Sequence, residues 1–326
     1  MSSDLKQDAV KGPPLAPAGR LGPGGLPEPL GRFCVLAAVL ALVFCMPLWN
    51  LARLSFKSEM YSHVLLIPLI TGYLIWIDRQ SVPFGSARPS RWAWIPFLLG
   101  GATLAAYWIL AARGWQPTRI NHLSITIFSF VCFIVGAGFL VLGDRVMKAV
   151  AFPFGFLIFM VPFPSVVEYA IEVFFQYTSA EAANVMLHLS YTPVVRDGLI
   201  FQLPGITIQV AKECSGIRSS LVLFITSLLA GHLFLRSPWR RTILTLAVIP
   251  LGIVRNGFRI WSIAMLCVHV DPGMIESFVH RKGGPIFFLL SLVPFFLFML
   301  YLRKSEVTAA QASAPGRKIE DAGKMS

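Results

Sequence analysis

Long apolar runs recur along almost the whole of this chain, and they limit its possible folds more than any other feature does. Each run is close to the roughly 20 residues that one helical crossing of a bilayer requires. A segment inside hydrocarbon must satisfy its own backbone hydrogen bonds, so each run is expected to form a helix. The sequence therefore predicts an all-α integral membrane protein with about eight transmembrane helices. We expect them near residues 33–52, 61–77, 92–112, 120–142, 147–164, 215–235, 242–268 and 285–302.

The two ends of the chain differ from this apolar region. Residues 1–31 are rich in Pro, Gly and Ala and offer too little apolar surface to order themselves. We expect residues 1–31 and 305–326 to be disordered cytoplasmic tails, and residues 32–304 to form one polytopic membrane domain. The first apolar run begins at Phe33 and is long enough to span, so no cleavable signal peptide is expected.

The net charge of +12 could suggest a nucleic-acid partner. The basic residues, however, flank the apolar runs and are not gathered in one patch, which is typical of membrane topology. If the N-terminus is cytoplasmic, the cytoplasmic connections hold the denser positive charge, and the longest connection, residues 165–214, lies outside. We therefore expect the lipid bilayer as a partner and no nucleic acid.

The long connection is expected to contain two kinds of structure. Glu168, Glu172 and Gln176 recur every four residues with apolar residues between them, which predicts an amphipathic helix on the outer leaflet with its carboxylates solvated. Short strand-like runs follow, separated by the turn signals Asp197-Gly198 and Pro204-Gly205. A small β-meander would then lead directly to Cys214, at the outer mouth of the sixth span.

Cys214 is the most informative single residue. It lies where a polar segment turns into an apolar helix, and the positive end of a helix favours the thiolate. The five cysteines show neither paired spacing nor a CxxC motif, so we expect no disulfide framework, no metal site and no cofactor. The other four lie in or at the end of apolar runs, where a thiol behaves as a small hydrophobe: Cys34, Cys45, Cys132 and Cys267.

Arg259 and His280 are expected on the same side of the membrane as Cys214. An arginine in an apolar run costs at least about 2.5 kcal/mol at mid-membrane, so Arg259 and Arg255 in the seventh span are functional candidates. Arg259 is expected near the outer surface, with Arg255 one turn deeper on the same face. His280 ends the outer loop before the eighth span. Cys214, Arg259 and His280 are therefore expected to converge on one outer-facing site.

This grouping suits acyl transfer. A thiolate is the nucleophile, a histidine protonates the leaving amine, and a guanidinium donates hydrogen bonds to the oxyanion. Each residue also has a simpler interpretation: an inert interfacial thiol, an arginine reaching the headgroups, and an ordinary loop histidine. Arg255, Arg218 and His63 are weaker candidates, for contact with substrate.

Three segments carry a resemblance to a known family. Residues 210–219 read VAKECSGIRS, residues 256–260 read NGFRI, and His280 stands before a glycine and an apolar span. Together with Tyr61-Ser62-His63 and Arg196-Asp197-Gly198, they resemble the bacterial exosortase branch of the exosortase/archaeosortase family.

The resemblance implies a membrane-embedded cysteine protease and transpeptidase of the Gram-negative inner membrane, with its active site facing the periplasm. It would cleave the C-terminal sorting signal of exported proteins, a Pro-Glu-Pro-like motif followed by a transmembrane helix and a basic tail. The exported protein would then be transferred to an acceptor nucleophile at the cell surface, which the sequence does not identify. The family's nucleophile, arginine and histidine correspond to Cys214, Arg259 and His280. The basic pair Arg281-Lys282 directly after His280 is a departure from the family pattern.

Three other functions stay open on the residues alone. A transporter would be expected to show ionisable or broken-helix features near mid-membrane in several spans, whereas the charges here lie toward the span ends. A metalloprotease would need HExxH or a similar ligand cluster, and the six histidines are scattered. A non-catalytic scaffold for exopolysaccharide export would lack a reactive Cys214.

Overall fold

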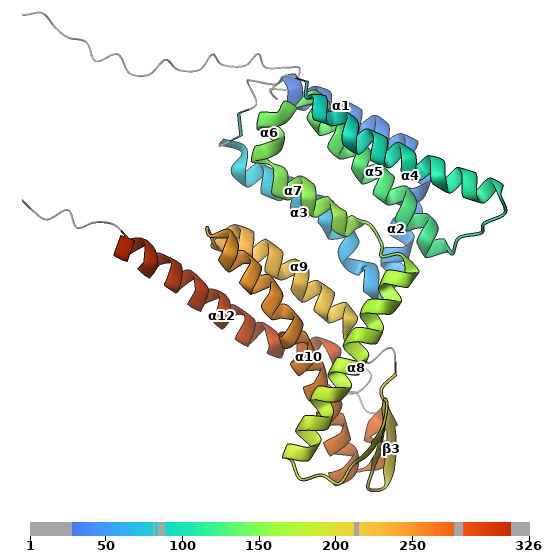
Figure 1. The fold of residues 1–326 in the computed structure, drawn as a ribbon, viewed down its shortest axis with the longest axis vertical. Coiled ribbons are helices and arrows are strands. Elements are labelled where there is room, and N and C mark those ends of the chain that lie inside the picture. The colour runs from blue at the N-terminus through green and yellow to red at the C-terminus, as the bar shows by residue number, and fades with distance from the viewer. Residues whose placement is uncertain (1–27, 81, 84–88, 212–214, 277–282, 314–326) are drawn as a thin grey trace, which may run out of the picture. The chain divides into compact units, whose positions relative to one another are not determined.

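The computed structural model describes residues 28–80, 82–83, 89–211, 215–276 and 283–313 (Figure 1). The chain divides into two compact units, Met1–Pro164 and Ser165–Ser326, which are described in turn. Within the described residues, six helices are long and apolar enough to cross a membrane. The number rises to eight if each of two broken helix pairs counts as one span. The predicted fold class, an all-α integral membrane protein, is confirmed.

The first unit is built from helices alone in its described part. Helices α4 and α5 lie side by side along their lengths, and α5 also contacts α1 and α2 (Figure 1). A second group is formed by α3 with α7. The elements are α1 (Glu28–Val43), α2 (Cys45–Lys57), η1 (Glu59–Leu65), α3 (Leu66–Ile77), η2 (Asp78–Gln80), η4 (Arg91–Ala93), α4 (Trp94–Ala112), α5 (Arg119–Val141), α6 (Gly143–Ala149), α7 (Ala151–Phe156) and η5 (Leu157–Met160).

Two of the expected spans are not single straight helices. The first is divided into α1 and α2, which meet at an angle of 77°. Helix α1 ends at Val43, four residues before Pro47, whose ring would clash with the carbonyl group that a continuous helix would use. The fifth, expected at residues 147–164, is mainly the stretch Ala151–Met160, which ends because Val161 is extended before Pro162. It is long enough to cross a membrane only if it is counted with the next helix, Ser165–Leu189, which was predicted to lie outside the spans.

The second unit combines four long helices with a small sheet. Helix α10 lies at its centre and contacts α8, α9 and α12 (Figure 1). The strand order is β1-β2-β3 with antiparallel pairing throughout, as the two turn signals predict. The elements are α8 (Ser165–Leu189), β1 (Val195–Asp197), β2 (Ile200–Leu203), β3 (Ile206–Gln209), α9 (Ile217–Phe234), α10 (Pro238–His269), η7 (Pro272–Glu276) and α12 (Gly284–Ser313).

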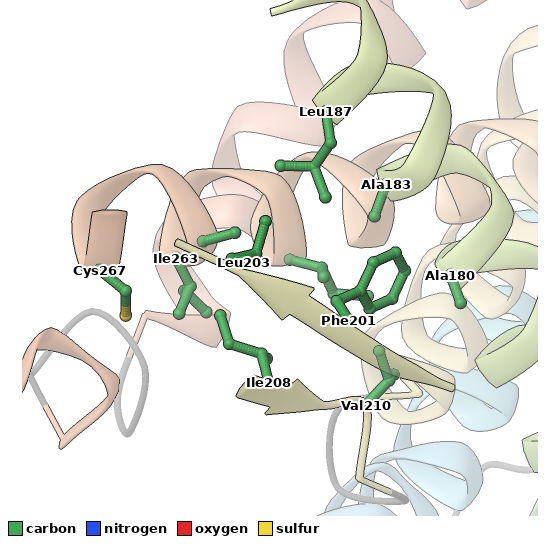
Figure 2. Close-up of a cluster of buried hydrophobic side chains, with 11 residues drawn as sticks. Ala180, Ala183, Leu187, Phe201, Leu203, Ile208, Val210, Ile263 and Cys267 are labelled. Atoms are coloured by element: carbon green, nitrogen blue, oxygen red, sulfur yellow. The ribbon is translucent and has the colours of Figure 1, made fainter. Parts of the chain in front are cut away.

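One apolar core joins the sheet to α8 and α10. Phe201 is almost fully buried and points toward Ala180 and Ala183 of α8, as Figure 2 shows. Alanines on α8 leave room for this ring and for the close approach of α10, where a Cβ added to Gly257 would lie 2.6 Å from the Cβ of Ala182. The rest of the core is Leu187, Leu203, Ile208, Val210, Ile260, Ile263, Ala264 and Cys267.

The polar face predicted for helix α8 is solvated only in part. Glu168 and Glu172 are partly exposed, whereas Gln176 is buried, and its side-chain Nε2 donates to the carbonyl oxygen of Val210 at 2.6 Å. Phe174 and Tyr177 are about half exposed, as is Tyr169. Lipid is the physical reason for this arrangement, because it accepts apolar side chains on the outside while polar groups find hydrogen bonds within the protein.

The end of α12 is tied to the start of α10. Both carboxylate oxygens of Glu306 accept hydrogen bonds from backbone N–H groups, one from Arg236 at 3.0 Å and one from Ser237 at 2.6 Å. Arg240 adds an ion pair to the same carboxylate at 3.7 Å. A carboxylate at a helix N-terminus satisfies N–H groups that have no partner within the helix. Helix α12 therefore continues past the boundary expected at residue 304 and ends at Ser313.

Candidate active site

The start of α9 is the centre of the candidate site. Gly216 precedes the helix with a left-handed backbone (φ +72°), a conformation that favours glycine. Its carbonyl oxygen accepts the first hydrogen bond of the helix, from the N–H of Ser220 at 3.0 Å. Cys214 comes two residues before Gly216 and, like His280, lies outside the described residues.

Arg255 reaches from α10 to this helix start. It is only 7% exposed, and its Nη2 donates to the carbonyl oxygen of Gly216 at 3.2 Å and to the hydroxyl of Ser220 at 3.1 Å. One nitrogen therefore holds both ends of the first turn of α9. The sequence predicted a cation close to phosphate or substrate, whereas the guanidinium is buried and bonded within the protein. Such directed bonds use the planar guanidinium in a way that a lysine ammonium does not reproduce.

Helices α9 and α10 approach closely around the Arg255 bonds. A Cβ added to Gly216 would lie 2.8 Å from the side-chain amide of Asn256, and one added to Gly252 would lie 2.8 Å from the hydroxyl of Ser220. Asn256 itself is almost fully buried. The glycines thus let the backbone of one helix reach polar side chains of the other, and the start of α9 is fixed by contact as well as by hydrogen bonds.

Three arginines share the region at the start of α9. Arg259 stands one helical turn beyond Arg255 on α10 and is partly buried, and its positive charge acts on both Arg255 and Arg218. Like charges at close range repel one another. The positive end of the α9 dipole has the same sign. The region at the start of α9 is therefore positive in character.

Two buried polar atoms add to this character. Among the residues that the structure describes, neither the Nη1 of Arg255 nor the hydroxyl oxygen of Ser215 has a hydrogen-bond partner. Buried polar groups are usually satisfied, and exceptions call for an explanation. Both atoms belong to residues next to Gly216 in space or in sequence, so buried hydrogen-bonding groups gather at this point of the described structure.

The weaker candidates fall in different places. Arg218 lies in the first turn of α9, within the electrostatic reach of Arg259. His63 lies in η1 of the first unit and is half-buried. The structure thus brings together Arg218, Arg255 and Arg259. No three His, Cys, Asp or Glu side chains in the described part of the chain could hold a metal ion.

Sequence reasoning missed several residues that build the site. Ser220 and Asn256 were not identified as site residues, and Gln176 was assigned to a solvated surface. A signal was present for the first two, since Gly216 with Ser220 and Gly252 with Asn256 both place a small residue four positions from a polar one in an apolar setting. No sequence signal points from Gln176 to Val210, because that bond joins residues 34 positions apart.

Comparison with known proteins adds one finding to this geometry. The family model described as "Transmembrane exosortase" matches residues 49–297, about three quarters of the chain. The matched region contains α9, α10 and all three arginines of the site. No curated protein and no solved structure matched the chain.

Proposed function

The chain belongs to the transmembrane exosortase family, and from this we propose that it is a cysteine protease and transpeptidase that acts on the C-terminal sorting signals of exported proteins. The catalytic residues of this proposal are Cys214, Arg259 and His280. The single observation that carries it is the convergence of arginines on the start of α9, three residues after Cys214, within the region that matches the family.

In the first step the Cys214 thiolate attacks the carbonyl carbon of the scissile peptide bond, and a C–S bond forms as the carbonyl π electrons move to oxygen. The start of α9 supports this step because positive charge close to a thiol favours its ionised form. The carbonyl oxygen becomes an oxyanion. Arg259 would stabilise this charge by donating hydrogen bonds that are strongest in the transition state.

Collapse of this tetrahedral intermediate breaks the C–N bond. His280 would donate its proton to the leaving nitrogen, which departs as the amine of the transmembrane segment. The exported protein is then held on Cys214 as a thioester. An acceptor nucleophile, or water, attacks the thioester carbonyl and gives up a proton to His280, and the thiolate is released in its starting form.

Arg255 has a supporting role in this mechanism. Its two hydrogen bonds hold Gly216 and Ser220, and Gly216 lies two residues from the nucleophile. A displacement of about 1 Å at a reacting atom costs on the order of 100-fold in rate. We therefore assign Arg255 as a positioning residue, and Arg259 as the oxyanion donor.

We place the enzyme in the bacterial inner membrane with both termini in the cytoplasm and the segment around Gly198 in the periplasm. The distribution of basic residues between apolar runs supports this orientation. Reporter fusions test it: those at Pro83 and Pro238 should read cytoplasmic, and one near Gly198 should read exported. The reverse pattern would place Cys214 on the face that exported substrates do not reach.

Replacement of the nucleophile tests the proposal most directly. Cys214→Ala and Cys214→Ser should both leave a co-produced sorting substrate uncleaved, because a hydroxyl without a dedicated base is a far poorer nucleophile than a thiolate. The matched control replaces Cys34, Cys45, Cys132 and Cys267 together by alanine and should still cleave. The measurement is the fraction of processed substrate at equal enzyme levels in the membrane. Cleavage by Cys214→Ala at the wild-type rate would disprove the thiol mechanism.

A further inference from the structure

A groove opens between α8 and the sheet, and none of the three arginines lines it. Its volume is about 520 Å³, within the usual range for binding sites. One wall is formed by α8 with Tyr169, Glu172, Gln176 and Tyr177, and the other by the end of β3 with Gln209 and Ala211. Val173, Leu199 and Val210 add apolar surface, so the lining combines apolar contacts with hydrogen-bonding groups, as a peptide requires.

Strand β3 is an edge strand, and its register decides which backbone groups are available. The N–H of Val210 donates to the carbonyl oxygen of Leu199 at 2.9 Å, and Phe201 is paired with Ile208 two residues along the ladder. In an antiparallel ladder hydrogen-bonded pairs alternate with non-bonded ones. Gln209, opposite Ile200, therefore turns its N–H and carbonyl away from β2. Gln209 also lines the groove.

Two further contacts define the groove. Gln176 donates to the Val210 carbonyl oxygen, which fixes α8 against the end of the strand. Tyr169 and Tyr177 are about half exposed, stand two helical turns apart on α8 and both line the groove. Free edge groups of a strand beside side-chain pockets are the features by which sheets bind extended peptides.

The position along the chain indicates which peptide would bind. Ala211 is three residues before Cys214, and an extended chain covers at most about 3.6 Å per residue, so the groove ends within roughly 11 Å of the nucleophile. We propose that this groove binds the extended segment of the substrate polypeptide next to the scissile bond. The backbone of that segment pairs with Gln209, and its alternate side chains lie against Tyr169 and Tyr177. This inference rests on the proposed function, since it supplies the substrate subsite of that reaction.

A pair of proline substitutions tests the pairing. Gln209→Pro removes the outward N–H but none that donates to β2, so the hairpin should survive. The same change at Thr207 removes the equivalent N–H outside the groove. We expect Gln209→Pro to raise KM for substrate cleavage about tenfold, the value of one hydrogen bond, and Thr207→Pro to change it less than about twofold. Equal KM values for Gln209→Pro and the wild type would overturn the proposal.

Cross-linking gives a second, independent readout. A photoreactive benzoylphenylalanine replaces Tyr177 in the full-length Cys214→Ala protein, and a co-produced sorting substrate is irradiated in the membrane. Cross-links to alternate residues beside the cleavage site support the groove, and cross-links only to lipid or to the transmembrane helix of the substrate reject it. If wild-type enzyme cleaves nothing while these cross-links form, the proposed catalysis fails and the binding groove stands. If cleavage proceeds without cross-links, the groove fails alone.

Discussion

Arg79 and Arg53 of the first unit and Arg255 of the second unit have opposite surroundings. In the first unit, arginines at helix ends lie over exposed tryptophan rings: Arg79 is 4.5 Å from the centroid of Trp76, and Arg53 is 5.2 Å from that of Trp49. Both tryptophans are more than half exposed. In the second unit, Arg255 is buried in a helix and bonds to the backbone start of another helix.

This difference shows that an arginine near an apolar run is not by itself a functional signal. Arginine and tryptophan together at a helix end are typical of the membrane interface, where the ring and the cation both meet headgroups. A buried arginine that donates to a carbonyl oxygen instead fixes backbone geometry. In the first unit these arginines lie over exposed rings at helix ends, and in the second Arg255 ties two helices together. Four predictions test this distinction.

The largest effect is expected at Arg259. Arg259→Lys keeps the charge but loses the planar donor geometry, and loss of one oxyanion donor costs about 100-fold to 1000-fold in rate. The measurement is the rate of substrate processing at matched enzyme levels. If Arg259→Lys lowers the processing rate no more than an arginine-to-lysine change in the first unit does, Arg259 is a membrane-interface residue and not an oxyanion donor.

A smaller but still large effect is expected at Arg255. Arg255→Lys should lower the processing rate roughly 10-fold to 100-fold, because a hydrogen bond from a charged donor contributes about 1.5–3 kcal/mol. The pH dependence of Cys214 alkylation separates positioning from simple destabilisation. If Arg255→Lys displaces the start of α9, the pH dependence of Cys214 alkylation should shift. If that pH dependence is unchanged and less protein accumulates, Arg255 has a structural role alone.

Gly216 and Gly114 both have left-handed backbones, so alanine substitutions at the two positions can be compared directly. Gly216 has φ +72° with Asn256 beside it, whereas Gly114 of the first unit has φ +90° with open space around its Cα. The backbone strain of about 1–2 kcal/mol is common to both Gly→Ala changes. Only Gly216→Ala must also displace Asn256, so we expect about a tenfold loss of processing there. Thermal unfolding of both variants provides the control, and equal activity in the two would remove the special role of Gly216.

The smallest effect is expected at Arg79. Arg79→Lys keeps a cation over Trp76, and an exposed cation–π pair contributes only about 0.5–1 kcal/mol. Processing should therefore stay within about twofold of wild type. A loss as large as that of Arg255→Lys would contradict the separation of the two units into anchor and site.

The sequence predicted those parts of the fold that depend on local pattern. Helical spans follow from apolar length, and the hairpin of β2 and β3 follows from Pro204-Gly205. The two broken spans were missed because apolar length was given more weight than Pro47 and Pro162. The burial of Gln176 on α8 was missed because a repeat of polar residues does not reveal whether water or protein will cover each of them. The orientation of Gln176 depends on Val210, and only the folded chain brings these residues together.

The same limit applies to the site. Arg255 and Arg259 stand out because arginine in an apolar run is rare, and their spacing of four fixes them on one face of α10. Their different surroundings could not be predicted, because Gly216 and Ser220 come from another helix. Cys214 and His280 stay predictions from sequence pattern, since the described residues do not include them.

The bond from Glu306 to the start of α10 limits how far this chain can be shortened. A protein cut after residue 304, where the sequence predicted a disordered tail, would lose the acceptor for the N–H groups of Arg236 and Ser237. Helix α10 carries Arg255 and Arg259, so a cut after residue 304 removes hydrogen bonds that hold the N-terminus of this helix. An affinity tag belongs after Ser313, beyond the last turn of α12.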